Sequence, residues 1–491
     1  MKLRFSDSTR RGFLKSSGAA LGALAFPSII PASVLGAAAP SKRIAVGIIG
    51  CGRIAATMDA PGLFANRDLA TCVALADPDL SRVAAFRELV RGKWACKDLA
   101  DARCHQDYRQ LIADPAVDAV MICTPEHWHA RMLVEAAMAG KDVYVQKPMA
   151  MSVTEGRAIV DAVKKYGRVF HMGTQQRSEG PDWFGPQFRQ AVEFVWDGRI
   201  GKVVKVEIGL PQDPDEYDWP TAEPIPEGFD WELWLGPAPY RPYSRLGSHA
   251  RGTKADPKNG YDIDTRPGWL TIQDYCMGMI TGWGSHHLDI AQWGLGEQLS
   301  GPDRIKGSCT YPRGRRLWDV HGPCDITLAY DRDNGIHTAG CEVRIVKELD
   351  APCGVRFIGE NGEWIFCARG KSVTASDPKT GSTEPKPLDA SKPDLVVGHV
   401  AKQAVRNTKS HHRIWFESIA TRRETNVPVE VAQRSTTACI LAYWSMKLGR
   451  ELKWNPATER FVNDAEADKT LVRAERGNWG LKPLLKYLYS T

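Results

Sequence analysis

From residue 42 onward, short apolar runs alternate with stretches in which apolar side chains recur at helical spacing. The apolar runs are rich in β-branched residues and lie at residues 43–50, 71–77, 117–124, 141–146 and 167–172. Residues 127–140 and 152–167 separate the later runs and have the three-and-four spacing of amphipathic helices. Because strands that alternate with helices build a parallel, doubly wound sheet, we expect an α/β domain over residues 40–172.

Beyond residue 173 the pattern changes to an alternation of apolar and polar positions, which is typical of half-buried strands. Such strands are predicted at residues 202–210, 324–330 and 336–346, and at 354–368, a hairpin with Asn361-Gly362 at its turn. Late segments that begin at residues 411 and 435 have helical spacing instead. We therefore expect residues 173–491 to form an α+β domain with an open, largely antiparallel sheet.

The first 39 residues differ from both domains. Twin arginines at positions 10 and 11 precede Phe13, Leu14 and Lys15, and a mildly apolar stretch then ends in the small residues 37–39. This order predicts a twin-arginine export signal over residues 1–39 and a periplasmic protein, although an amphipathic first helix is the alternative. No later run approaches the roughly 20 apolar residues of a membrane span, so we expect no membrane contact after signal removal.

Charge and cysteine content narrow the function classes. Lys and Arg total 64 against 58 Asp and Glu, a net charge of +6, and most of this excess lies in the first 39 residues. The remainder is too close to neutral for a nucleic-acid surface. Twelve cysteines are dispersed without a C-x-x-C pair, so we expect mostly unpaired thiols and no metal site. Cys96 and Cys104 are the two cysteines to test first for a disulfide.

The first apolar run passes directly into the sequence GCGRIA, in which Gly50, Gly52 and Ala55 form a G-x-G-x-x-A turn. A tight strand-to-helix turn without a ligand would look the same. The second run, however, ends in Asp77, whose carboxylate would accept hydrogen bonds from ribose hydroxyls. These features predict a Rossmann domain that binds a dinucleotide through Gly50, Gly52, Arg53, Ile54 and Asp77. The stretch ADPD has no cation for a 2′-phosphate, so we expect NAD and not NADP.

Two further strand ends point to the same edge of the predicted sheet. Thr124 ends the third run and precedes Pro125 and His129, and Gln146 ends the fourth run and precedes Lys147. Because ligands bind at the carboxyl ends of parallel strands, we expect all five near the nicotinamide. A lysine at the end of an apolar strand is costly to bury, which suggests that its amine has a task. For His129, the alternative is that it satisfies loop backbone groups.

Four motifs in register give the chain a resemblance that covers essentially everything after the signal. They are the glycine turn, TPEHWH at 124–129, the lysine-proline pair at 147–148, and GWGSHHLDIAQWGLG at 282–296. Together they resemble the Gfo/Idh/MocA family of sugar and cyclitol oxidoreductases, in its exported branch. The resemblance implies a homo-oligomer, a dimer or a tetramer, and a cis bond before Pro148.

In that family a lysine of E-K-P and a histidine of D-x-x-x-H-x-x-D lie beside the sugar hydroxyl. By resemblance these are Lys147 and His286, with Asp289 as the last acid, while His287 is expected to be structural. Gln146 replaces the usual glutamate, and Gly282 replaces the first aspartate. The missing carboxylates put either the usual proton transfer or the usual substrate in question.

The chemistry supports these residue types on its own terms. Oxidation of a carbinol needs a base, or a hydrogen-bond donor for the developing oxyanion, and both an imidazole and a buried amine can serve. Gln175, Gln176 and Arg177 lie where the first domain ends, and we expect them to bind substrate hydroxyls together with Asp289. The alternative for residues 175–177 is a solvated linker.

The leading interpretation is a periplasmic NAD-dependent oxidoreductase that acts on a hydroxyl of a sugar, sugar derivative or glycoside. Folding before export would let the chain leave the cytoplasm with NAD tightly bound. A redox-neutral glycosidase or lyase that acts through a transient keto-sugar is the first alternative. A carbohydrate-binding protein without catalysis is the second.

Overall fold

A computed structural model describes most of the chain. The described residues are 43–94, 101–178, 185–211, 222–249, 261–262, 265–311, 317–347, 353–370, 386–404 and 409–490. The expected export signal at residues 1–39 and Cys96 lie outside the described residues.

The first sheet is the predicted parallel one. Within the described residues it has six strands in the order β3-β2-β1-β4-β5-β6, and every neighbouring pair is parallel. Their bounds are β1 (Ile44–Ile49), β2 (Ala70–Ala76), β3 (Arg103–His105), β4 (Ala119–Ile122), β5 (Asp142–Val145) and β6 (Phe170–Met172). Strands β4 to β6 are buried at every position, because helices cover both faces of the sheet.

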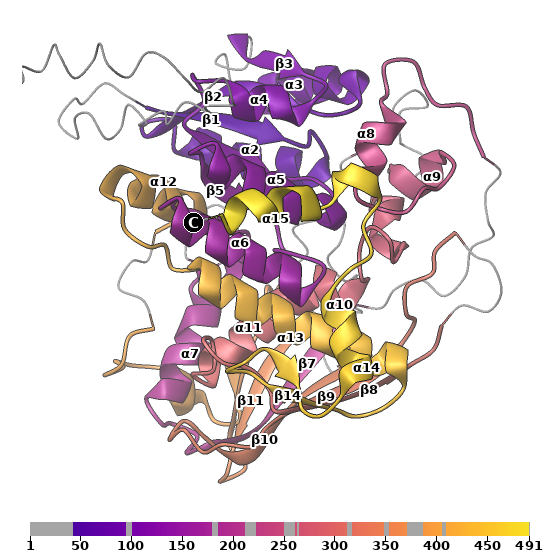
Figure 1. Cartoon of the computed structure of the whole chain (residues 1–491). Helices are drawn as coiled ribbons and strands as arrows, with labels where there is room; N and C mark the ends of the chain where they lie inside the picture. The colour runs from indigo at the N-terminus through magenta and orange to yellow at the C-terminus, as the bar shows by residue number, and fades with distance from the viewer. Residues whose placement is uncertain are drawn as a thin grey trace, which may run out of the picture.

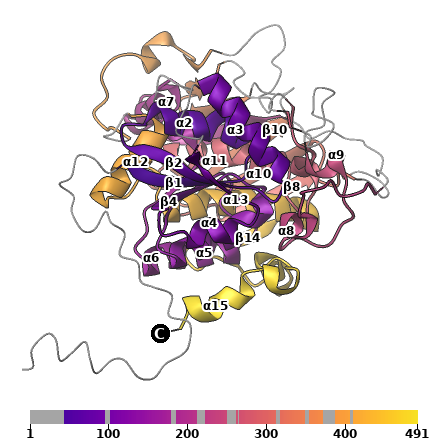
Figure 2. The ribbon, with the colours of Figure 1, turned by 90° about the horizontal axis from the view of Figure 1, so that it is seen from above.

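Figure 2 shows how the helices divide between the two faces of this sheet. One face carries α2 (Ala60–Ala65), α3 (Leu80–Trp94) and, from far along the chain, α12 (His411–Thr421). The other carries α4 (Tyr108–Ala113), α5 (Glu126–Met138) and α6 (Val153–Lys165). The turns before α5 and α6 place the residues that follow β4 and β5 at one edge of the sheet.

The second sheet is mixed and mostly antiparallel. Its described strands follow the order β13-β12-β11-β7-β10-β9-β8-β14-β15, and only the β7–β10 pair among them is parallel. The bounds are β7 (Val203–Leu210), β8 (Arg304–Cys309), β9 (Cys324–Tyr330), β10 (His337–Lys347), β11 (Gly354–Gly359), β12 (Trp364–Cys367), β13 (Leu388–Ala390), β14 (Leu452–Asn455) and β15 (Arg460–Phe461). The predicted fold class is therefore confirmed.

The two faces of the second sheet differ in polarity. Helices α7 (Gln187–Trp196), α11 (Gly284–Gly294) and α13 (Val429–Leu448) contribute to the apolar core on one face. The other face carries ion pairs such as Lys205–Glu207 and Arg344–Asp325. Helix α13 lies between the two sheets and joins the domains (Figure 1). The homo-oligomer stays a prediction.

Residues 222–249, called the arm from here on, return from the second domain to the first. The arm contains α8 (Trp231–Leu235) and α9 (Arg245–Ser248) and packs, together with residues 269–275 and 317–318, around a largely aromatic core. Phe229 forms a β-bridge with Asp79, and the Asp230 N–H donates to the Pro78 carbonyl at 2.9 Å. The arm therefore covers the region beyond the end of β2.

The last described residues reinforce this arrangement. The segment that leads to α15 (Lys482–Leu488) runs from the second domain back along the first (Figure 1). Along it, Arg473 pairs with Glu155 of α6, and Arg476 donates to the carbonyls of Gly236 and Ala238 in the arm. The end of the chain thus ties the arm to the first domain.

Three further observations apply to the described residues. None of their helices is long and apolar enough to cross a membrane. Their eleven cysteines form no disulfide with one another. No three of their His, Cys, Asp or Glu side chains cluster in a way that could hold a metal ion.

Candidate functional site

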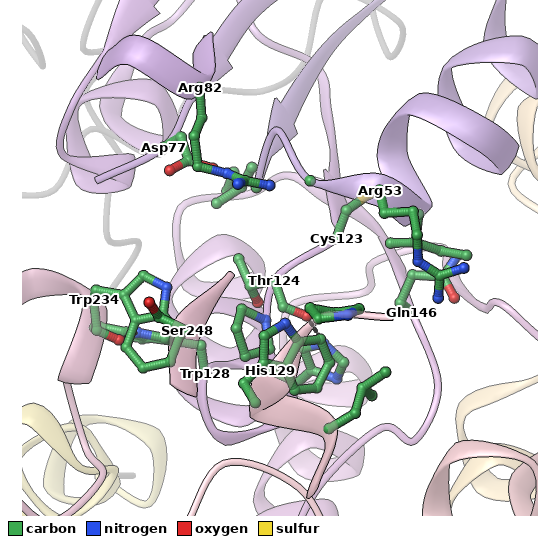
Figure 3. A pocket seen from close by; sticks show the side chains of 18 of the residues that line it. Arg53, Asp77, Arg82, Cys123, Thr124, Trp128, His129, Gln146, Trp234 and Ser248 are labelled. Atoms are coloured by element: carbon green, nitrogen blue, oxygen red, sulfur yellow. Dashed lines mark hydrogen bonds between the residues drawn. The ribbon is translucent and has the colours of Figure 1, made fainter. Parts of the chain in front are cut away.

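A large cavity lies where the carboxyl ends of the parallel strands face the arm and the second domain (Figure 3). It contains about 1520 Å³ of space not filled by protein atoms, including the part open to solvent. The sequence-predicted residues that line it are Gly50, Gly52, Arg53, Ile54, Asp77, Thr124, Pro125, His129, Gln146, Lys147, Gln175 and His286. Gln176, Arg177 and Asp289 do not line it.

The glycine turn has the shape that a phosphate-binding loop requires. Gly50 has φ of +92°, and a Cβ there would lie 2.8 Å from the backbone of Cys123, so that only glycine fits. A Cβ on Gly52 would meet only the Nη2 atom of Arg82, at 3.7 Å. The backbone at Gly52 therefore faces open space in which the phosphates of a dinucleotide can lie.

Asp77 ties this turn to the end of β2. Its Oδ2 accepts a hydrogen bond from the Cys51 N–H at 2.8 Å, and its Oδ1 accepts one from the Asp79 N–H at 3.0 Å. Burial raises the pKa of Asp77 to about 6, and the positive charge of Arg82 opposes this rise. The expectation that no cation accompanies Asp77 was wrong, because the first turns of α3 bring Arg82 into the cavity wall (Figure 3).

His129 lies near the end of the cavity at Lys147 and contacts two backbone carbonyls there. Its Nδ1 lies 2.7 Å from the Pro148 carbonyl oxygen, and its Nε2 lies 3.0 Å from that of Thr124. Burial lowers the pKa of His129 to about 4, so the ring is uncharged at neutral pH and donates to one carbonyl at a time. The contacts match the alternative in which His129 satisfies loop backbone, and they hold Thr124 against the corner at Lys147.

Lys147 connects the two domains across the cavity. It follows β5 directly, the peptide bond to Pro148 is cis, and its Nζ donates to the carbonyl of Gly282 at 2.7 Å. Gly282 ends the short helix α10 (Met279–Gly282) of the second domain. Burial lowers the pKa of Lys147, and the negative charge of Glu126 is the largest effect that opposes this decrease.

His286 reaches the cavity from the first turn of α11. Its side chain is 5% exposed, and no described residue gives its Nδ1 a hydrogen bond. Burial, and then the charges of Arg369 and Lys147, hold the pKa of His286 well below its usual value. The neighbouring His287 points elsewhere, with Nε2 3.5 Å from Cys353 Sγ, as expected for a structural histidine.

For Arg177 and Asp289, the predicted substrate contact needs correction. Arg177 Nε donates to Asp289 Oδ2 at 2.5 Å and Nη2 donates to Oδ1 at 2.9 Å, and both side chains are buried. Ser435 Oγ adds a hydrogen bond to Asp289, and Gln298 accepts one from Arg177. The two charges satisfy each other away from the cavity.

The two glutamines at this junction also differ from expectation. Gln176 is 1% exposed and outside the cavity lining, and its side-chain amide has no hydrogen-bond partner among the described residues. Gln175 does line the cavity, and its Nε2 donates to the Tyr144 hydroxyl at 3.0 Å. The alternative of a solvated linker fails as well, because residues 175–177 are buried.

Sequence reasoning missed Asp59, which explains the glutamine at position 146. Gln146 Nε2 donates to both carboxylate oxygens of Asp59, at 2.9 and 2.8 Å, and His412 Nε2 lies 3.2 Å from the same group. A glutamate at 146 would place a second carboxylate against a fully buried one. No motif signals Asp59, which lies in a helical turn after the glycines.

Glu126 and Arg369 were also missed. Glu126, inside the TPEHWH motif, is 2% exposed and accepts hydrogen bonds from Cys276 Sγ and Thr281 Oγ1, each at 3.0 Å. Burial raises the pKa of Glu126 to about 7. Arg369, just after β12, lines the cavity with its guanidinium 4.3 Å from the ring centroid of Trp283.

The glycine turn, the acid at the end of β2 and the two domains that meet at one cavity define a dinucleotide-binding α/β protein. Residues 44–174 match the family model described as the oxidoreductase family, NAD-binding Rossmann fold. Residues 390–481 match the model for the C-terminal alpha/beta domain of the oxidoreductase family. These matches confirm the predicted NAD cofactor.

Similar curated proteins include inositol dehydrogenases. An inositol 2-dehydrogenase of Rubrobacter xylanophilus is 31% identical over 324 residues, which is 66% of this chain and 71% of that protein. An uncharacterized oxidoreductase and a scyllo-inositol 2-dehydrogenase of Bacillus subtilis are both 31% identical over shorter regions, 36% and 23% of this chain. The matches span only 47% and 32% of those two proteins. The chain belongs to the Gfo/Idh/MocA oxidoreductase family.

Solved structures support the fold alone. GenD2 from gentamicin A biosynthesis, in complex with NAD, superposes with a TM-score of 0.55 at 16% identity over 85% of this chain and 98% of that one. An aldose-aldose oxidoreductase from Caulobacter crescentus superposes with a TM-score of 0.53 at 19% identity over 84% of this chain and all of that one. Both share the two-domain architecture.

Proposed function

We propose that this protein is a periplasmic NAD-dependent oxidoreductase that acts on a hydroxyl group of a sugar, a sugar derivative or a glycoside, and that it retains its NAD. The observation that most directly supports this proposal is that Lys147 of the first domain and His286 of the second line one cavity beside the glycine turn. An amine and an uncharged imidazole that line the same cavity suit removal of a hydroxyl proton.

The residues around the cavity fit NAD. The open face at Gly52 suits the diphosphate, Asp77 retains free acceptor positions for ribose hydroxyls, and the buried Thr124 hydroxyl has no partner among the described residues. When bound, NAD⁺ supplies an acceptor for the hydride that leaves the carbinol carbon.

We assign the proton to Lys147 and the orientation of the hydroxyl to His286. Burial lowers the pKa of Lys147, which increases the fraction of uncharged amine that can accept the hydroxyl proton at Nζ. The Nδ1 of His286 is buried without a partner among the described residues, so it suits a hydrogen bond with the substrate oxygen. Trp269 and Trp283 also line the cavity and suit the apolar faces of a sugar ring.

Retention of the cofactor rests on the arm. Trp234, Ser248 and His249 of the arm line the same cavity as Asp77, and Gln106 Nε2 bridges the carbonyls of Pro78 and Gly228, at 3.0 and 2.9 Å. An adenosine bound at Asp77 would lie beneath the arm, so these contacts would slow its release. A retained cofactor also suits an exported protein, because the periplasm offers little free NAD.

The first experiment measures the nucleotide that the purified, cytoplasmically folded protein releases on denaturation. We expect close to one NAD or NADH per chain. A nucleotide content near zero, with weak binding of added NAD, would overturn retention and leave an exchanging dehydrogenase or a binding protein.

The second experiment identifies the reaction. Myo- and scyllo-inositol, aldoses, levoglucosan and aryl glycosides are offered singly and in pairs, and cofactor absorbance and products are followed. Oxidation of a cyclitol or sugar supports the proposal. Cleavage of a glycoside without net NADH would favour the redox-neutral glycosidase or lyase, which an enclosed cofactor also permits. Sugar binding without turnover, unchanged by Lys147→Ala, would favour a carbohydrate-binding protein.

A further inference from the structure

The carboxylates that the family places beside its lysine and histidine are absent here from positions 146 and 282. The side chain of Gln146 donates to both carboxylate oxygens of Asp59 and not toward Lys147. A buried amine that gains a proton still needs a negative charge nearby, because an uncompensated buried ammonium is costly. The described residues around Lys147 provide one such charge from a different place.

That charge is Glu126, the first residue of α5. Its carboxylate is 2% exposed and does not line the cavity. Thr281 Oγ1 donates to it at 3.0 Å and Cys276 Sγ at 3.0 Å, both from the segment of the second domain that leads into α11. Through these hydrogen bonds Glu126 links the first domain to the second, outside the cavity that Lys147 lines.

The same segment contacts the amine. Gly282, next to Thr281 in the chain, accepts the hydrogen bond from Lys147 Nζ at 2.7 Å. Thr281 Oγ1 also lies 3.1 Å from the Gly278 carbonyl oxygen, so its single proton goes to Glu126 or to that carbonyl at any one time. The Thr281 side chain thus binds the Glu126 carboxylate, and the carbonyl of the next residue, Gly282, binds the Lys147 amine.

We propose that Glu126 is the positioning residue for Lys147 and supplies the counter-charge when Nζ takes the substrate's proton, in place of the carboxylates missing at 146 and 282. This inference rests on the proposed function. In the step considered, the carbinol O–H bond breaks and its proton forms an N–H bond at Nζ, while the carbinol C–H bond breaks and a carbonyl forms; bound NAD⁺ would supply the hydride acceptor. The negative charge of the Glu126 carboxylate then favours the resulting ammonium, and Thr281 and Gly282 set the relative positions of the two groups.

Other charged or titratable groups around the amine act in the opposite direction or are less direct. Arg53, from the glycine turn, and Arg369, after β12, both disfavour a charged Lys147. The thiol of Cys276 favours it less than Glu126 does. His129 and His286 are held uncharged by burial, with Lys147 contributing to the lowered pKa of each. Removal of Glu126 therefore leaves two arginines acting on the amine with little opposition.

The test reads the charge of Lys147 directly and needs no substrate. The full-length protein, with its nucleotide, is labelled with trace acetic anhydride from pH 6 to 11, and acetylation of Lys147 is measured by mass spectrometry against the exposed Lys453. In Glu126→Gln we expect the half-labelling pH of Lys147 to fall by about one unit or more, since an adjacent opposite charge is lost. Glu126→Asp, which keeps the charge, should restore most of the shift.

Glu155→Gln is the matched control, because Glu155 is a buried glutamate in the first turn of the next helix, α6, and pairs with Arg473. It should leave the labelling of Lys147 at the wild-type value. Thr281→Val removes a hydrogen bond but no charge, so it separates geometry from electrostatics. An unchanged half-labelling pH in a folded Glu126→Gln protein overturns the inference, as does an equal shift in Glu155→Gln.

Activity provides the second readout. With a probe that the wild type oxidises, Glu126→Gln should lower kcat about tenfold or more and move the rising limb of the pH profile, while KM stays near its wild-type value. A labelling shift in a protein that oxidises no probe would sustain the charge coupling and refute the proposed function. Turnover without a labelling shift would support the proposed function and refute the charge coupling between Glu126 and Lys147.

Discussion

Two pairs of polar residues join the same parts of the molecule and differ in what they do. Arg177, after β6, meets Asp289 of α11, and Lys147, after β5, lines the cavity with His286 of the same helix. Arg177, Asp289 and His286 are all at most 5% exposed. Lys147 is half-buried at the cavity wall, so burial separates the two pairs only in part.

Satisfaction of the hydrogen-bonding groups separates them. The guanidinium and carboxylate of the first pair meet through two hydrogen bonds, and Gln298 and Ser435 satisfy further positions. In the second pair, Lys147 donates to one carbonyl, and His286 leaves Nδ1 without a partner among the described residues. A buried charge with complete partners needs no ligand, whereas incomplete partners beside a cavity indicate a site that expects a ligand.

The largest expected effect comes from the cavity pair. Lys147→Met should lower turnover by about 10²- to 10⁴-fold, because the proton acceptor is lost, while the free energy of unfolding stays equal or rises. NADH formation with an accepted probe, together with urea denaturation, measures both. Lys141→Met is the control at the other end of β5, since Lys141 Nζ donates to the Asp114 and Val117 carbonyls. It should lower stability and spare kcat.

The next effect belongs to the structural pair. Arg177→Met should lower the free energy of unfolding by about 3 to 5 kcal/mol, because it leaves the Asp289 carboxylate buried and unpaired. Urea denaturation measures this loss. The double variant with Asp289→Leu should recover most of it, since no buried charge then remains. A stable Arg177→Met protein with a raised KM would restore the substrate role that the sequence suggested.

His287, the neighbour of His286 in the chain, allows a test through the pH dependence of stability. Burial lowers the pKa of His287 to about 3, so the folded protein excludes a proton that the unfolded chain binds below about pH 6.5. Stability from His287 is therefore complete above pH 6.5 and decreases as the pH falls, by about 2 kcal/mol at pH 5. His287→Leu should lose that much less stability between pH 7 and 5 in denaturant melts. An identical acid dependence in both proteins would contradict this.

The smallest effect tests the glutamine at position 146. Gln146→Glu should cost about 1 kcal/mol or more at pH 8, because a second carboxylate then faces Asp59. The cost should decrease as the pH falls, since protonation removes one of the two charges. Thermal melts at pH 5 and 8 measure it, and Asp59→Asn in the same chain should abolish it. A pH-independent cost would point to packing and not to charge.

Much of the fold follows from local pattern. Periods of two and of three to four residues located the principal strands of both sheets and the late helices, because a strand or helix with one apolar face must bury that face. Strands β3, β8 and β13 to β15 were not predicted. They are short or carry exposed residues at alternate positions, so their local signal is weak.

The sequence by itself determined the family, the glycine turn and the strand ends that line the cavity, because those positions depend on motifs and on the direction of a parallel sheet. Only the tertiary structure decided which buried charges serve the fold and which face the cavity. Arg177 and Asp289 are 112 residues apart, and Gln146 and Asp59 are 87 apart. Glu126 approaches Lys147 through Thr281 and Gly282. Such pairings depend on how elements distant in the sequence pack together, so the local pattern of apolar and polar residues does not predict them.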